Sequence, residues 1–101
     1  ILKSAVDLMK KDMVTRCFKI IGRVQGVFFR DSTKRKAADF DVLGSAINLA
    51  NGSVEVIAQG SESGVNELLK WLQVGPEMAV VERVDEVAIS DDLEFNDFTI
   101  G

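Results

Sequence analysis

Histidine is absent from this chain of 101 residues, and cysteine, proline and tryptophan each occur only once. The absence of histidine excludes Ser-His and Cys-His catalysis, imidazole general bases and most zinc sites. One cysteine cannot build a thiolate metal site or an intrachain disulfide. Any catalysis must therefore depend on electrostatics, positioning or carboxylates, and we expect neither a metal nor a cofactor.

Carboxylates are plentiful, but no acid–base pair stands out among them. Asp91-Asp92 and the scattered glutamates fall at turn-like or solvent-facing positions. The net charge of −4 is unevenly distributed: residues 16–36 contain seven Lys or Arg and one Asp, a net charge of +6, whereas residues 82–97 contain seven acids and one Arg, a net charge of −6. The basic segment would attract an anion, and we interpret the other charged residues as solvent-exposed faces of the protein.

Length and hydrophobicity indicate one compact domain, which we assign to residues 13–101. Residues 1–12 precede it as an extension, either a short helix or a segment that is not native. The chain has no apolar run of about 18 residues, so no membrane span is expected. Cys17 lies within a predicted strand as a small buried side chain, which favours a reducing cytoplasm.

The most informative segment is residues 22–30, which follow an apolar strand, contain two glycines and deliver Arg30 to the start of a helical stretch. Backbone N–H groups of such a loop converge near a helix N-terminus, and the Arg30 guanidinium adds a planar, permanent positive charge. The loop lacks the Gly-Lys-Ser/Thr ending of a nucleotide P-loop and a cysteine nucleophile before Arg30. With these two alternatives excluded, the loop is interpreted as a phosphate-sized anion site without a covalent nucleophile.

The sequence GRVQGVFFR at 22–30 resembles the signature loop of the acylphosphatase family, and residues 44–56 match the spacing of its second motif. The resemblance extends over about residues 14–100 and implies metal-independent hydrolysis of small-molecule acyl phosphates by direct attack of water. It implies that Arg30 binds the phosphate and that Asn48 positions the water, with phosphate or sulfate binding as product or analogue. The implied phosphate-binding amides are those of Gln25, Gly26, Val27, Phe28, Phe29 and Arg30.

Three alternatives remain beside a free-standing enzyme. An RNA-binding module is disfavoured, because the chain is acidic and its strands lack paired exposed aromatics, so we expect no nucleic-acid partner. Acylphosphatase-like domains also occur within larger factors, including hydrogenase maturation proteins. A degenerate anion-binding domain is the third alternative, since Ser45 and Leu49 stand where family members often carry an aromatic and a hydroxyl residue.

Hydrophobic spacing predicts the element order β-α-β-β-α-β with one further C-terminal strand. Asn51-Gly52 predicts a hairpin, and Val65, Leu68, Leu69 and Leu72 form a helical stripe. The order favours an α+β fold of the ferredoxin-like (split βαβ) type, with two helices on one face of a four- to five-stranded antiparallel sheet. Separately, we expect the protein to be a monomer. The predicted strands are 14–21, a strand opened by Gly44, 53–59, 80–89 and 94–100, and the helices are 29–41 and a second after Gly60 that ends at Gly75-Pro76.

Overall fold

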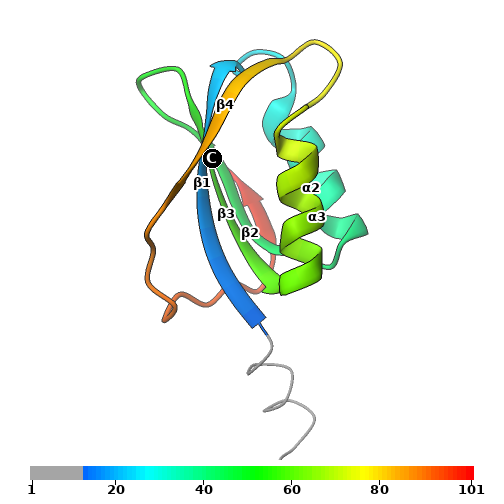
Figure 1. The fold of residues 1–101 in the computed structure, drawn as a ribbon, viewed down its shortest axis with the longest axis vertical. Helices are drawn as coiled ribbons and strands as arrows, with labels where there is room; N and C mark the ends of the chain where they lie inside the picture. The colour runs from blue at the N-terminus through cyan, green and yellow to red at the C-terminus, as the bar shows by residue number, and fades with distance from the viewer. Residues whose placement is uncertain (1–12) are drawn as a thin grey trace, which may run out of the picture.

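A computed structural model describes residues 13–101, so the proposed extension at 1–12 lies outside the described residues. Two helices cover one face of a five-stranded sheet, as Figure 1 shows. This arrangement confirms the predicted ferredoxin-like α+β fold. In chain order the elements are β1 (Met13–Arg23), α2 (Phe29–Asp39), β2 (Leu43–Asn48), β3 (Val54–Ser61), α3 (Glu62–Leu72), β4 (Val80–Val87) and β5 (Phe98–Ile100).

The sheet is mixed, so the prediction of an entirely antiparallel sheet is wrong at one edge. The strand order is β4-β1-β3-β2-β5, and only the β2–β5 pair is parallel. After β4 the chain crosses the lower end of the sheet in Figure 1 and enters β5 beside the start of β2. Because this connection stays at one end of the sheet, β5 must run in the same direction as β2.

Residues 88–97, which join β4 to β5, contain no strand, although a strand was predicted from residue 94. The Gln59 side chain explains the difference, because it forms hydrogen bonds with this segment. Its Nε2 donates to the Leu93 carbonyl oxygen (2.6 Å), and its Oε1 accepts from the Phe95 N–H (3.3 Å). Part of the segment is thus paired with a side chain instead of a neighbouring strand, and β5 begins only at Phe98.

The core lies between the sheet and the helices, as the hydrophobic patterns predicted. Alternate residues of the central strands are buried, as are Val65, Leu68 and Leu72 of the stripe on α3, whereas Leu69 is partly buried. Phe29 at the start of α2 packs against Trp71 of α3, with ring centroids 5.7 Å apart. Trp71 is partly buried at the core's edge. The central buried side chains are Phe18, Ile20, Val54, Val56, Ala58, Val65, Leu68 and Leu72.

Local hydrogen bonds define the hairpin and the helix start that the sequence predicted. The Leu49 N–H donates to the Ser53 carbonyl oxygen (2.9 Å), and the Gly52 N–H donates to the Leu49 carbonyl oxygen (3.1 Å). These two bonds close the turn between β2 and β3. Ser61 caps α3, because its Oγ accepts from the Gly64 N–H (3.0 Å). Helix α2 ends at Asp39, two residues before the predicted end. Within residues 13–101, no helix is both long and apolar enough to cross a membrane.

Candidate active site

The segment between β1 and α2, which we call the signature loop (residues 24–28), follows a point near the end of β1 where this strand loses its regular register with β4. The irregularity falls between Ile21 and Gly22. Gly22 has a φ of 141°, and a Cβ at this position would lie 2.1 Å from the Val80 carbonyl oxygen. Only glycine therefore allows the backbone of β4 to approach this closely, and the chain turns away from the sheet toward α2.

Two residues of the signature loop have left-handed backbone conformations, Gly26 with φ 75° and Phe28 with φ 60°. Such turns direct successive N–H groups toward a common concave side. The first hydrogen bond of α2 runs from Ser32 N–H to the Phe28 carbonyl oxygen (3.0 Å). In the described part of the chain, no protein acceptor receives a hydrogen bond from the N–H groups of residues 25–31. These N–H groups, at the positive end of the helix dipole, are available to an anion.

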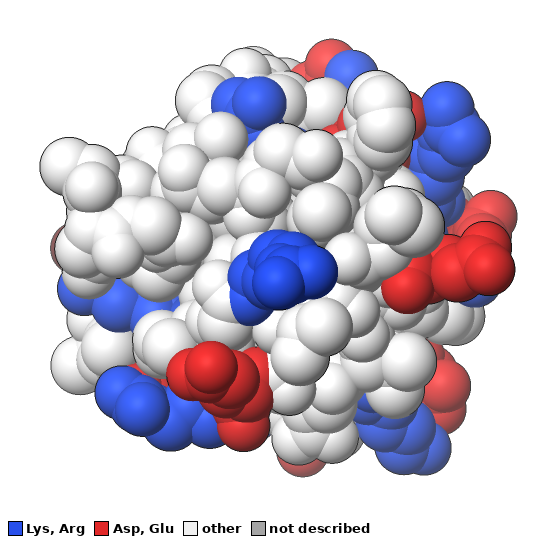
Figure 2. All heavy atoms as spheres, turned by 90° about the horizontal axis from the view of Figure 1, so that it is seen from above, with Lys and Arg blue, Asp and Glu red and all other residues white. Residues whose placement is uncertain are grey.

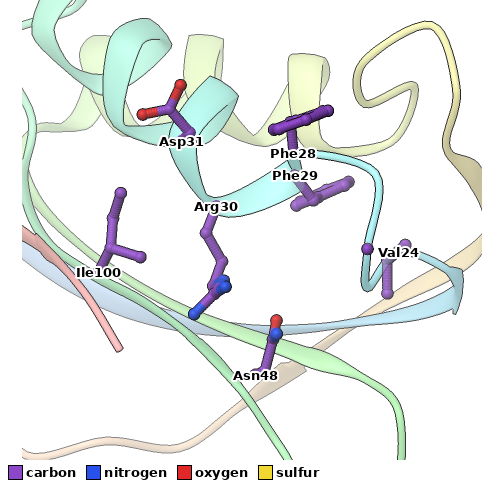
Figure 3. Close-up of a pocket in the computed structure, with 8 residues that line it drawn as sticks. Val24, Phe28, Phe29, Arg30, Asp31, Asn48 and Ile100 are labelled. Carbon is purple, nitrogen blue, oxygen red and sulfur yellow. The ribbon is translucent and has the colours of Figure 1, made fainter.

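A cavity of about 250 Å³ opens between the signature loop, the start of α2 and the ends of β2 and β5. Figure 3 shows the Arg30 side chain extending from α2 toward Asn48, which lies at the end of β2. The Asn48 side chain is exposed to this opening. The lining residues are Val24, Gly26, Phe28, Phe29, Arg30, Asp31, Asn48 and Ile100.

The guanidinium of Arg30 is oriented by the end of β5. Its Nη1 donates to the carbonyl oxygen of Gly101, which also accepts from the backbone N–H of Asn48 (3.2 Å). The neighbouring Asp31 pairs with Arg35 (2.9 Å) and not with Arg30. Among the described residues, no Asp or Glu side chain forms an ion pair with Arg30, so no carboxylate side chain competes with an anion in the cavity for its charge.

Gln25 connects the signature loop to the hairpin that follows Asn48. Its side-chain Nε2 donates to the carbonyl oxygens of Leu49 (2.8 Å) and Ser53 (2.9 Å). The loop carrying the free N–H groups and the strand carrying Asn48 are thereby joined side by side. The sequence indicated only a backbone role for Gln25, because nothing in it places residues 25, 49 and 53 together.

The structure brings most of the predicted site residues to one cavity. Arg30 and Asn48 line it together with three of the loop residues, whereas Gln25 and Val27 do not. Val27 packs against the core, and the Gln25 side chain is directed to the hairpin. The predicted site did not include three of the lining residues, Val24, Asp31 and Ile100. Val24 reads as an ordinary apolar residue, and only the parallel pairing of β5 with β2 brings Ile100 near Arg30.

Ser45 and Leu49, the two departures from the family pattern, do not line the cavity. Ser45 pairs with Ile57 in the sheet, and Leu49 belongs to the hairpin turn. The departures therefore leave the lining of the cavity unchanged. The two side chains on which the chemistry would depend, Arg30 and Asn48, are both present.

The shifted pKa values belong to groups that do not line the cavity. Burial raises the pKa of the Cys17 thiol to about 11, so this thiol stays neutral and unreactive near pH 7. The hydrogen bond from Arg16 lowers the pKa of the Glu86 carboxyl, and the two groups are 2.7 Å apart on β1 and β4. Across residues 13–101, no group of three or more His, Cys, Asp or Glu side chains is placed to bind a metal.

Viewed from the end that carries the signature loop and the hairpin, the molecule is covered mainly by uncharged side chains, with basic side chains near the middle (Figure 2). Acidic side chains and further basic side chains lie farther out. An anion approaching the middle of this end therefore meets positive charge, with the acidic side chains farther away.

Comparisons with known proteins agree with the geometry. The family model described as Acylphosphatase matches residues 17–100. An acylphosphatase from Alkalilimnicola ehrlichii is 46% identical over 77 residues, which cover 76% of this chain and 86% of that protein. The structure of an acylphosphatase from Coxiella burnetii superposes with a TM-score of 0.81 at 33% identity and covers 92% of this chain and 97% of its own. Full-length HypF, in a phosphate- and nucleotide-bound form, gives a TM-score of 0.74 at 25% identity over 88% of this chain but 12% of HypF.

Proposed function

Because the chain belongs to the acylphosphatase family and is a hydrolase of small-molecule acyl phosphates, we propose that the cavity between the signature loop and the end of β2 is its active site. The N–H groups of residues 25–30 and the Arg30 guanidinium bind the phosphoryl oxygens. The Asn48 side chain orients the attacking water, since its amide both donates and accepts hydrogen bonds. The observation that carries this proposal is the convergence of Arg30 and Asn48 on one cavity beside unpaired loop N–H groups.

The chemistry of the substrate explains why such a small set of groups suffices. An acyl phosphate is a mixed anhydride whose leaving group is a carboxylate, so the departing oxygen needs little protonation. The water oxygen attacks phosphorus, the bond between phosphorus and the bridging oxygen breaks, and both water protons finish on the phosphate. The remaining demands are an in-line approach and stabilisation of charge on the equatorial oxygens, which positioning and fixed donors supply.

An Arg30→Ala variant tests the phosphate-binding role, with Arg23→Ala as the matched control. Arg23 is an exposed arginine at the end of β1 that does not line the cavity. We expect Arg30→Ala to lower the rate of benzoyl phosphate hydrolysis by at least the roughly 10²–10³ typical of one lost preorganised donor. Calorimetry should also show weaker phosphate binding. A folded Arg30→Ala protein with the parent's activity would refute the proposed site.

An Asn48→Ala variant separates water positioning from phosphate binding. Hydrolysis should collapse, because the water is no longer oriented, whereas the affinity for phosphate should stay within a few-fold of the parent's. Loss of phosphate binding along with the rate would make Asn48 a phosphate ligand or a structural residue, and the mechanism would be wrong. A wild-type protein that binds phosphate but does not hydrolyse benzoyl phosphate would support the degenerate alternative.

We further propose that the protein acts as a monomer in the cytoplasm. One chain supplies all the residues that line the cavity, and the single buried cysteine suits a reducing compartment. Size-exclusion chromatography with light scattering, combined with activity measured across a range of protein concentrations, tests the monomer. A rate per chain that falls on dilution would contradict it.

A further inference from the structure

One apolar side chain beside the cavity is not accounted for by packing. Phe28 is 80% exposed, whereas Val24 and Phe29, the neighbouring apolar lining residues, are 1% exposed and belong to the core. Phe29 pairs with Trp71, but Phe28 is not part of the core cluster. A large aromatic that contributes this little to the core suggests a role outside folding.

The backbone at Phe28 strengthens this point. Its φ of 60° and ψ of 27° lie in the left-handed region, at the residue that precedes α2. This conformation is uncommon for a bulky residue, and glycine or asparagine would adopt it with less strain. Strained positions of this kind cluster at functional sites. Neither the conformation nor the packing favours phenylalanine here, so its ring is available for another purpose.

The position of Phe28 suggests what the ring contacts. Figure 3 shows Asn48 on one side of Arg30 and Phe28 on the other, at the start of α2. In an in-line displacement, the attacking water and the departing carboxylate lie on opposite sides of phosphorus. If Asn48 positions the water, as proposed above, the acyl group leaves on the side where Phe28 lies.

We propose, on the basis of the proposed function, that the Phe28 ring is an apolar contact surface for the acyl group and that the enzyme favours acyl phosphates with an aromatic acyl group. The exposed ring stacks against or covers the departing group, which removes apolar surface of both from water. Acetyl phosphate offers only a methyl group to this surface. The ring therefore sets the preference among acyl groups, whereas the loop amides and Arg30 bind the phosphate common to all of them.

The test compares kcat/KM for benzoyl phosphate with kcat/KM for acetyl phosphate in each variant, relative to the same ratio in the parent. This normalisation cancels the difference in intrinsic reactivity between the two substrates. Phe28→Asn removes the ring but tolerates the left-handed backbone, whereas Phe28→Tyr retains the ring. Met78→Ala is the control, because Met78 is 71% exposed and does not line the cavity.

We expect Phe28→Asn to lower the benzoyl-to-acetyl ratio roughly two- to tenfold, the range that one aromatic contact supports. Phe28→Tyr and Met78→Ala should keep the ratio within about twofold of the parent's. An unchanged ratio in Phe28→Asn, or an equal loss of rate with both substrates, would overturn the proposal. A ratio that responds to Ile100→Ala instead would place the acyl group along β5 and also overturn it. These outcomes differ from a failure of the proposed active site, in which Arg30→Ala would remain active on both substrates.

Discussion

Replacing Gln25 with methionine should weaken both the fold and the rate, because its side chain joins the signature loop to the hairpin after Asn48. Methionine preserves the length and the unbranched shape of the side chain but cannot donate to the carbonyl oxygens of Leu49 and Ser53. Each of these oxygens also accepts a backbone N–H, from Gly52 and Leu49 respectively, so neither loses every partner. The substitution therefore removes two hydrogen bonds without creating an unsatisfied group.

The expected cost follows from the two bonds. A typical intramolecular hydrogen bond contributes about 0.5–1.5 kcal/mol net, so the loss of both should cost about 1–3 kcal/mol. In a domain of this length, 1 kcal/mol shifts the melting temperature by roughly 4–8 °C. Thermal and urea unfolding measure this loss. Gln73→Met is the matched control, since Gln73 is exposed at the end of α3 and should change the midpoint little.

The effect of Gln25→Met on the rate should depend on Asn48. A misalignment of about 1 Å between reacting groups can cost roughly 10² in rate, so kcat for benzoyl phosphate should fall at least tenfold. In the Asn48→Ala background the same substitution should lower kcat little further, because the Asn48 side chain whose alignment it disturbs is already absent. This role for Gln25 would be refuted if the double variant lost kcat by the product of the two single losses. It would also be refuted if Gln25→Met alone left the melting temperature and kcat unchanged.

Three further predictions concern the anion, the glycine near the end of β1 and the buried thiol. Phosphate at about 100 times its Kd should stabilise the native state by roughly 2.7 kcal/mol in thermal unfolding, and Arg30→Ala should lose this protection. Gly22→Ala should lower the urea midpoint markedly, because its Cβ would lie 2.1 Å from the Val80 carbonyl oxygen; an unchanged midpoint would contradict this. Cys17 has a pKa of about 11 in the folded state, above the ordinary thiol value of 9.0 that applies to the unfolded chain, so the unfolded thiol loses its proton first. Stability should therefore fall as the pH rises from about 9 to about 11. Cys17→Ala should lack that part of the fall.

The amino-acid sequence by itself determined the local elements and the chemical groups available to the site. The leucine stripe of α3, the Asn51-Gly52 turn and the strand–loop–helix of residues 18–38 each depend on neighbours within a few positions, so their spacing is visible in the chain. The resemblance of residues 22–30 and 44–56 to one family identified Arg30 and Asn48. Both side chains line the cavity.

Only the tertiary structure decided how distant segments meet. Three features of the site depend on such contacts: the parallel pairing of β5 with β2, the hydrogen bond from Arg30 to Gly101, and the hydrogen bonds from Gln25 to the hairpin. The residues that they join are between 24 and 71 positions apart in the sequence. No local spacing encodes such contacts, because they depend on strand register and on the path of residues 88–97 across the end of the sheet. The exposure of Phe28 beside the cavity is likewise a property of the folded chain, since an isolated Val-Phe-Phe sequence predicts burial for all three residues equally.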